Sequence, residues 1–200
     1  MVTTAIFKDA VAGRVKVNDL NLEGDAQADL TVHGGWSKAV YVYPGEHYEY
    51  WRNELPEMEL GNSQFGENLT TEGLLDDDVS VGDRFRVGTA ELVVTQPRLP
   101  CFKLGLRMSD PHFPRRFQHV GRMGAYLRIL REGELGAGDE IRVVERPEHE
   151  VTMELMADAR LNRGGHDERL LAAPGLPEKW RRRAASAAAP SRAAAAERRA

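Results

Sequence analysis

Two segments of the chain repeat one pattern: a Gly-Asp turn followed by a strand in which polar and apolar residues alternate. These segments are residues 81–87 and 137–143. Alternation with a period of two is typical of half-buried strands, and Gly-Asp pairs are common in the turns between them. The repeated pattern therefore indicates a β-rich barrel and argues against a series of βαβ units.

Short strands and turns of this kind fill most of residues 1–147. We expect strands at residues 38–43, 84–87, 90–95, 126–130 and 140–144. Helices are predicted over residues 44–55, 152–161 and 177–189. Pro147 marks the expected end of the strand-rich part. The fold class we predict is mainly β (α+β): a closed β-barrel domain over residues 1–147 with a few peripheral helices, and a helical C-terminal appendage over residues 148–183.

The end of the sequence differs in composition from the rest. Residues 184–200 are mostly Ala and Arg and include no large apolar side chain, so we expect a disordered or loosely helical tail. Residues 160–200 contain ten basic and four acidic side chains, which leaves residues 1–159 with a net charge of −10. Such an acidic body does not resemble a surface that binds a nucleic-acid duplex. No apolar run of 18 residues and no secretory signal pattern is present, so we expect a cytoplasmic protein without a membrane span.

The chain contains one cysteine, Cys101, which excludes an internal disulfide framework and any zinc site built from several cysteines. Pro97 and Pro100 precede it, so we do not expect a regular central strand at this point. Arg98 and Lys103 lie nearby in the sequence, and cations of this kind lower the pKa of a thiol and favour the thiolate. A thiolate suits a soft metal ion or nucleophilic chemistry. The alternative is a buried cysteine that packs as a small apolar side chain.

Two further clusters could bind a ligand or could serve the fold alone. Gly66 permits a tight turn beside Glu67 and Asn68, which could hydrogen-bond a polar heterocycle or could close a turn on their own backbone. His33 and Lys38 flank a pair of glycines that would let a ligand approach the backbone closely. Lone histidines are frequently structural, and that interpretation of His33 also remains open.

These clusters stand in a fixed order that resembles the MOSC domain family, named for the C-terminal domain of molybdenum cofactor sulfurases, and its stand-alone bacterial YiiM-like subfamily. The matching segments are residues 33–40, 65–69, 96–104, 124–128 and 133–139. The resemblance covers residues 1–147, and residues 148–183 resemble the helical appendage of that subfamily. It implies a barrel whose cleft holds a molybdenum cofactor, a molybdenum-pterin compound.

The resemblance also implies roles for individual residues. Cys101 is expected to be the catalytic residue and the protein ligand of molybdenum. The residues expected to bind the cofactor are His33, Lys38, Gly66, Glu67, Asn68, Gln96, Arg98, Lys103, Tyr126 and Arg128.

The implied activity is the reduction of small N-hydroxylated compounds, such as hydroxylaminopurine-type bases and hydroxylamines. The sequence has no flavin or nicotinamide motif, so electrons would come from a separate reductase. Two alternatives remain open: a carrier of sulfur or of the cofactor that acts through Cys101, and a non-enzymatic module that binds a ligand or a partner. An exposed barrel face and an amphipathic appendage are compatible with a homodimer.

Overall fold

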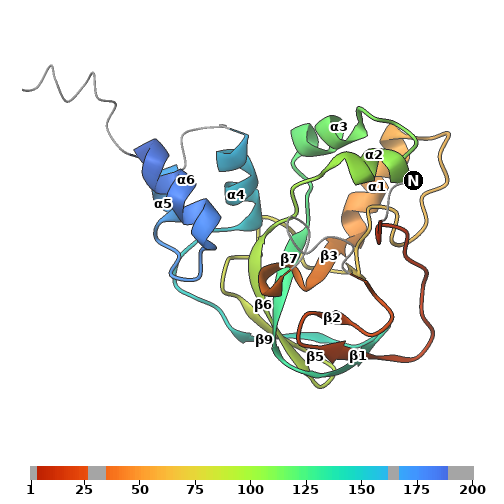
Figure 1. Ribbon diagram of the computed structural model, residues 1–200, viewed down its shortest axis with the longest axis horizontal. Coiled ribbons are helices and arrows are strands. Elements are labelled where there is room, and N and C mark those ends of the chain that lie inside the picture. The colour runs from red at the N-terminus through yellow and green to blue at the C-terminus, as the bar shows by residue number, and fades with distance from the viewer. Residues whose placement is uncertain (1–3, 27–34, 162–166, 189–200) are drawn as a thin grey trace, which may run out of the picture.

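The computed structural model describes residues 4–26, 35–161 and 167–188, and short strands dominate its first part (Figure 1). The strands are β1 (Arg14–Asn18), β2 (Asn21–Leu22), β3 (Val40–Pro44), β4 (Leu69–Thr71), β5 (Arg84–Val87), β6 (Ala90–Pro97), β7 (Ala125–Arg131), β8 (Gly133–Gly136) and β9 (Ile141–Glu145). They form a six-stranded sheet in the order β4-β3-β7-β6-β5-β9 and a three-stranded sheet in the order β2-β1-β8. Among the strands of the described residues, β3 and β4 form the one parallel pair.

The two sheets curl into a half-barrel that is accompanied by several helices, which confirms the predicted α+β fold of barrel type. Among the described residues the hydrogen bonding runs through two separate sheets, whereas we had expected one closed ring. Each of the five strands predicted from the sequence is present, at bounds within two residues of those expected. β1 and β8 were not predicted as strands, and they pair with each other between Val17 and Gly133 at one end and Arg14 and Gly136 at the other.

The two repeated segments form the neighbouring strands β5 and β9, which pair antiparallel with Phe85 opposite Val143. Their turns share the same hydrogen bond. Asp83 accepts a hydrogen bond from the Ser80 N–H at 3.0 Å, and Asp139 accepts one from the Gly136 N–H at 3.0 Å. The aspartate of each Gly-Asp pair therefore fixes the entry to its strand.

Helices lie beside the sheets and at the C-terminal end. They are the 3-10 helix η1 (Trp36–Lys38) and the α-helices α1 (Gly45–Glu54), α2 (Phe102–Arg107), α3 (Phe113–Val120), α4 (Met153–Arg160), α5 (Asp167–Leu170) and α6 (Glu178–Ala188). The helices α1, α4 and α6 lie where the sequence predicts helices. The helices α2 and α3 were not predicted. Each is short, Gly105 lies in the middle of α2, and Pro114 lies in the first turn of α3. Within the described residues, no helix is both long and apolar enough to cross a membrane.

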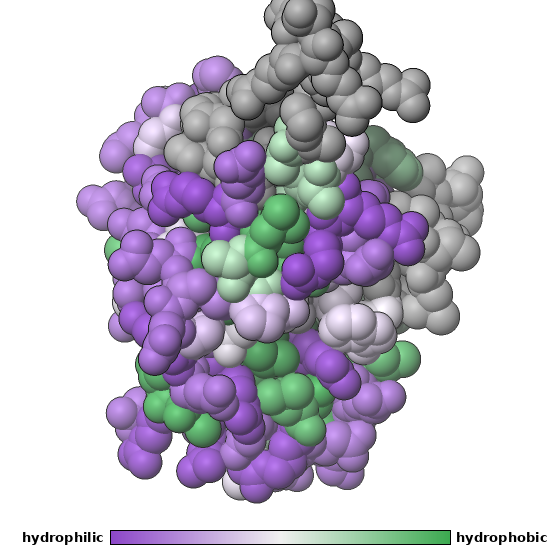
Figure 2. Space-filling view, turned by 90° about the vertical axis from the view of Figure 1, so that its left-hand side faces the viewer, coloured by the Kyte–Doolittle hydropathy of each residue, from purple (hydrophilic) through white to green (hydrophobic). Residues whose placement is uncertain are grey.

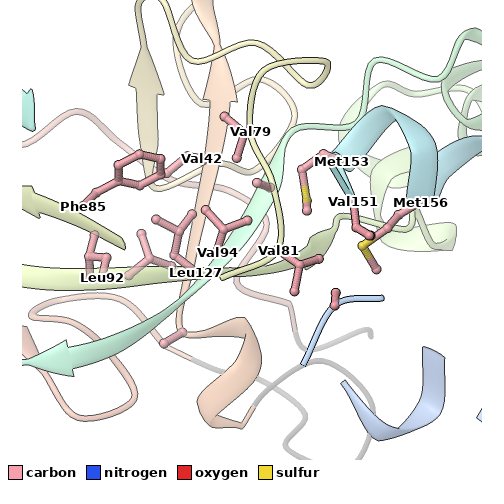
Figure 3. Close-up of a cluster of buried hydrophobic side chains, with 14 of the residues drawn as sticks. Val42, Val79, Val81, Phe85, Leu92, Val94, Leu127, Val151, Met153 and Met156 are labelled. Atoms are coloured by element: carbon pink, nitrogen blue, oxygen red, sulfur yellow. The ribbon is translucent and has the colours of Figure 1, made fainter. Parts of the chain in front are cut away.

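One hydrophobic core joins the barrel to the appendage. Val81 and Val94 of the barrel lie beside Met153 and Met156 at α4 (Figure 3), and Trp180 of α6 belongs to the same cluster of buried side chains. Thr152 caps α4 by accepting a hydrogen bond from the Leu155 N–H at 3.1 Å. The appendage is therefore packed against the sheet that carries the candidate site.

A second core consists mainly of aromatic side chains from α1, α3 and the segment before β4. The rings of Trp51 and Phe117 stack with their centroids 5.6 Å apart, and Tyr43 and Phe65 pack beside them at 4.8 Å. Tyr43 accepts a hydrogen bond from Trp51 Nε1 at 2.8 Å, which satisfies a buried donor. This aromatic core lies directly behind the candidate site.

The end of α6 extends into the segment that we had expected to be a tail. The helix continues through Ala188, and Ala184 is completely buried. Figure 2 shows this side of the molecule, where most of the surface is hydrophilic and the apolar patches are separate. The rest of the expected tail, residues 189–200, lies outside the described residues.

A chain that ends after Arg183 is expected to unfold at a lower temperature than a chain that ends after Ala188. The shorter chain loses the buried Ala184 and the last turn of α6, at a cost of about 1–2 kcal/mol. For a domain of this size that corresponds to a decrease of roughly 2–8 °C in Tm, measured by thermal denaturation. Both chains lack residues 189–200, so equal Tm values would contradict a stabilising role for residues 184–188.

Candidate functional site

A pocket lies beside Cys101, between the N-terminal segment, β3 and the segment that leads into α2. We call it the Cys101 pocket. The predicted site residues that line it are Lys38, Gly66, Asn68, Arg98, Cys101, Lys103 and Tyr126. Residues up to 88 positions apart in the sequence therefore meet at one place, as the order of their motifs predicts.

The backbone around Cys101 departs from regular strand geometry. The central strand β6 continues through Pro97, but its register against β7 shifts between Val94 and Gln96, which marks a bulge. Cys101 then lies in extended conformation immediately before α2 and is half-buried. Its carbonyl accepts a hydrogen bond from the Leu104 N–H at 3.0 Å. The thiol is therefore held at the pocket wall and remains partly accessible.

Arg98 is the most deeply buried cation of the pocket, with 5% of its surface exposed. Its guanidinium lies over the rings of Tyr41, at 5.2 Å, and Phe117, at 5.6 Å, and it hydrogen-bonds the Tyr126 side chain. Its Nη1 is buried and has no hydrogen-bond partner. A buried donor of this kind is costly unless a ligand satisfies it, so this atom indicates the position of an anion or another acceptor.

The charge state of these groups follows from their surroundings. Burial lowers the pKa of Arg98, but Tyr41, Tyr126 and Cys101 raise it and the net shift is upward, so the guanidinium stays charged. Burial raises the pKa of Tyr126, although Arg98 opposes this shift, so its phenol stays protonated at neutral pH. The pocket therefore presents a fixed cation beside a hydroxyl donor.

Lys38, at the end of η1, adds a second positive charge. Burial lowers the pKa of its ammonium group, and the nearby Lys179 lowers it further, whereas Cys101 raises it. Lys179 comes from α6, which is fixed to the end of β6 by a hydrogen bond of 2.8 Å from Trp180 Nε1 to Gln96 Oε1. Together with Lys103, these side chains make the pocket cationic within a strongly acidic body.

The appendage is therefore expected to contribute to anion binding through Lys179. Lys179→Glu is expected to weaken the binding of inorganic pyrophosphate to the protein by about three- to tenfold, because it reverses a charge near Lys38. Lys179 is exposed, so its replacement is expected to leave Tm unchanged. Isothermal titration measures the affinity, and Lys179→Arg serves as the matched control. Equal affinities for the Glu variant and the unmodified protein would exclude this contribution.

The pocket lining also includes Lys8 and Asp25, which the sequence analysis did not select, and they lie with Asn68, which it did. Asp25 forms an ion pair with Lys8 at 2.6 Å and accepts a hydrogen bond from Asn68 Nδ2 at 2.6 Å. Asn68 Oδ1 accepts a hydrogen bond from the Tyr41 N–H at 2.9 Å. Asn68 thus joins the N-terminal segment to β3, a structural task that accompanies its place on the pocket.

Gly66 is required where the N-terminal segment passes over this wall. Its φ of 84° lies in the left-handed region, and a Cβ atom there would come within 2.7 Å of Ile6 Cγ1. The glycine therefore allows Ile6 to approach closely, and Thr4, Ala5, Ile6 and Lys8 line the pocket.

Other predicted cofactor-binding residues do not line the pocket. Glu67 is buried behind its wall, where it accepts hydrogen bonds from the Ser63 N–H at 3.0 Å and from the Tyr48 hydroxyl. Gln96 is engaged by Trp180, as described above. Arg128 is exposed, with its guanidinium 4.7 Å from the centre of the Trp36 ring. His33 lies outside the described residues.

The lining residues that the sequence analysis missed include Lys8, Asp25 and Tyr41, and it also missed Lys179, which lies outside the lining but near Lys38. Lys8, Asp25 and Lys179 belong to segments without a recognisable motif, and only the tertiary fold brings them together. Tyr41 was expected as part of a strand, where alternation gives no sign of which strand face carries a ligand.

A larger cavity of about 580 Å³ lies between the barrel and the appendage. Its lining includes six acidic residues, among them Asp77, Glu150 and Asp158, and it contains none of the predicted site residues. An acidic cavity does not suit an anionic ligand, so we place the candidate site at the smaller Cys101 pocket.

These observations place the chain among barrel-type proteins, with a curled mixed sheet and with a thiol and several cations at one pocket. Comparison with known proteins identifies the family: residues 29–142 match the MOSC domain model, and the chain belongs to the MOSC domain family. The protein YiiM of Escherichia coli is 39% identical over 183 residues, which covers 90% of this chain and 82% of YiiM. The crystal structure of YiiM from Geobacillus stearothermophilus covers 94% of this chain, with 90% of its own chain matched, at a TM-score of 0.80 and 30% identity.

A third relative is a longer protein from Gibberella moniliformis named "Reductase". It is 38% identical over 149 residues, which cover 73% of this chain but only 26% of that protein. The expected MOSC fold and the family assignment are thus confirmed, and the family is one associated in general with the molybdenum cofactor.

Proposed function

We propose that this protein is a molybdenum-cofactor-dependent reductase of small N-hydroxylated compounds and receives its electrons from a separate reductase. The observation that carries the proposal is the position of Arg98 in a MOSC fold: a buried guanidinium beside Cys101 with an unpartnered Nη1. The relative named "Reductase" is consistent with an oxidoreductase role. The match covers only 26% of that relative, so most of that protein lies outside the matched part. This is consistent with a reductase that needs components besides the MOSC domain.

The residues of the Cys101 pocket fit such a cofactor. The Cys101 sulfur is a soft ligand of the kind that molybdenum accepts, and it lies partly accessible at the pocket wall. Arg98, Lys38 and Lys103 would face the anionic dithiolene and phosphate groups, which explains a cationic pocket in an acidic body.

The proposed reaction converts R–NHOH to R–NH₂ and water. It breaks the N–O bond, consumes two electrons and two protons, and releases the oxygen as water. The molybdenum centre, when bound, supplies the two-electron redox chemistry. Tyr126 keeps its proton at neutral pH because burial raises the pKa of its phenol, so it can donate a hydrogen bond to the N-hydroxyl oxygen. Lys38 supplies a second protonated group on the same wall.

The test is to produce the protein in a host that makes the molybdenum cofactor. We expect about one molybdenum per chain by elemental analysis, and reduction of 6-N-hydroxylaminopurine when reduced methyl viologen supplies the electrons. Bound molybdenum without reduction would favour a cofactor carrier. An additional sulfur on Cys101 by intact mass, without molybdenum, would favour a sulfur carrier. Neither molybdenum nor sulfur would favour a binding module and exclude the proposal.

A further inference from the structure

Exposed apolar side chains surround the start of α2, next to the Cys101 pocket. Phe102 and Leu106 are 59% and 48% exposed, and their spacing of four residues places them on one face of α2. The opposite face of the helix is buried through Leu104 and Gly105. Leu99, which lines the pocket, is 36% exposed. An apolar face of this kind beside a binding pocket is typical of a protein contact site.

The same surface carries positive charge. Between residues 96 and 109 the sequence contains three cations, Arg98, Lys103 and Arg107, and no acidic residue. The Arg107 guanidinium lies 5.0 Å from the centre of the Phe7 ring, which is itself 56% exposed, and its buried Nε has no hydrogen-bond partner. We define the α2 surface as Phe7, Leu99, Phe102 and Leu106 with the cations Lys103 and Arg107.

We propose that the α2 surface is the docking site for an acidic electron-transfer protein that delivers electrons to the Cys101 pocket. This inference rests on the proposed function, because only a reductase needs such a partner. Cys101 directly precedes α2 and lines the pocket, so a protein seated on α2 covers the pocket mouth. Electron transfer slows steeply with distance, which favours docking at this position over any other face.

Charge selects the partner. An acidic carrier meets two cations on an apolar face, whereas the remaining body of this protein is acidic and repels it. A second copy of this chain is a poorer occupant, because a twofold contact through α2 would bring Lys103 and Arg107 near their own copies. Transient electron-transfer contacts are small, so a few exposed apolar anchors suffice.

The test uses flavodoxin, an acidic one-electron flavin protein, as the probe. Isothermal titration of the protein with oxidised flavodoxin measures docking without any need for the bound cofactor. Leu106→Glu is expected to weaken this binding at least tenfold, because it places a negative charge in the contact. Leu106→Lys is expected to retain the affinity within about threefold, since it suits an acidic partner. Val144→Glu is the matched control, because Val144 of β9 is 42% exposed and lies outside the α2 surface. It is expected to leave the affinity for flavodoxin unchanged.

Activity measurements separate this inference from the proposed function. With the cofactor loaded, Leu106→Glu is expected to slow reduction driven by flavodoxin at least tenfold and to leave reduction driven by methyl viologen unchanged. No reduction with methyl viologen in the unmodified protein would remove the proposed function itself. If Leu106→Glu raises the KM for the N-hydroxylated substrate in the methyl viologen assay, the α2 surface binds the substrate, and the docking proposal is overturned.

Two binding results would also overturn it. One is the absence of measurable binding between flavodoxin and the unmodified protein. The other is an equal loss of affinity for flavodoxin in Leu106→Lys and Leu106→Glu, which would show that charge does not select the partner.

Discussion

Arg98→Met is expected to weaken binding of the anionic ligand strongly while the protein keeps its fold. The methionine keeps much of the apolar length that packs against Tyr41 and Phe117, but it removes the guanidinium. Charge-assisted hydrogen bonds contribute about 1.5–3 kcal/mol each, so the affinity is expected to fall by roughly ten- to 150-fold. Isothermal titration with inorganic pyrophosphate measures this change on the protein without cofactor.

The stability half of this prediction distinguishes a binding role from a structural one. The unpartnered Nη1 donor is a cost to the folded state, and the methionine removes this cost together with the hydrogen bond to Tyr126, so we expect only a small net change in Tm. Arg98→Lys is the matched control, because it keeps the charge and loses the planar arrangement of donors. A large drop in Tm for Arg98→Met, with unchanged pyrophosphate affinity, would show that Arg98 serves the fold and would contradict the proposed site.

The sequence predicts the local parts of the fold well, since those parts depend on neighbouring residues. Alternation is sufficient to identify β5, β6 and β9, and the Gly-Asp turns before Arg84 and Glu140 are closed by their own aspartates. The pairing of β1 with β8 joins residues more than 100 positions apart, and no local pattern predicts it. The short helix α2 was missed for a related reason, because six residues with a central glycine give too little helical periodicity.

In the candidate site, too, the sequence predicts what local motifs carry and misses what depends on contacts between distant segments. Motifs predict Cys101, Arg98 and Lys38, and these residues do meet at one pocket. Polar residue type alone does not separate a group that faces the pocket from one that supports it. Glu67 looks like a ligand-binding carboxylate in the sequence, but in the structure its oxygens accept hydrogen bonds from neighbouring backbone and hydroxyl groups. Lys179 comes near Lys38 from α6, a helix that the hydrogen bond from Trp180 to Gln96 helps to hold in place.

Cys101→Ser is expected to have the largest effect on the loaded protein. Molybdenum content is expected to fall from about one per chain to near zero, and reduction of 6-N-hydroxylaminopurine with methyl viologen is expected to fall at least 100-fold. A serine hydroxyl is a hard donor that stays protonated at neutral pH, so it cannot replace a soft thiolate. Elemental analysis and the methyl viologen assay measure the two effects.

The fold is expected to tolerate this change. Cys101 is half-buried, so replacing its sulfur by oxygen is expected to change the free energy of unfolding by about 1 kcal/mol or less, and thermal denaturation provides that control. A serine variant that keeps its molybdenum and its rate would remove Cys101 as the ligand. Comparison with Arg98→Met adds a further distinction, since pyrophosphate binding without cofactor should be strongly weakened in Arg98→Met and retained in Cys101→Ser. Because the chain contains a single cysteine, no other thiol can compensate, and a loss in this variant is assigned to one sulfur atom.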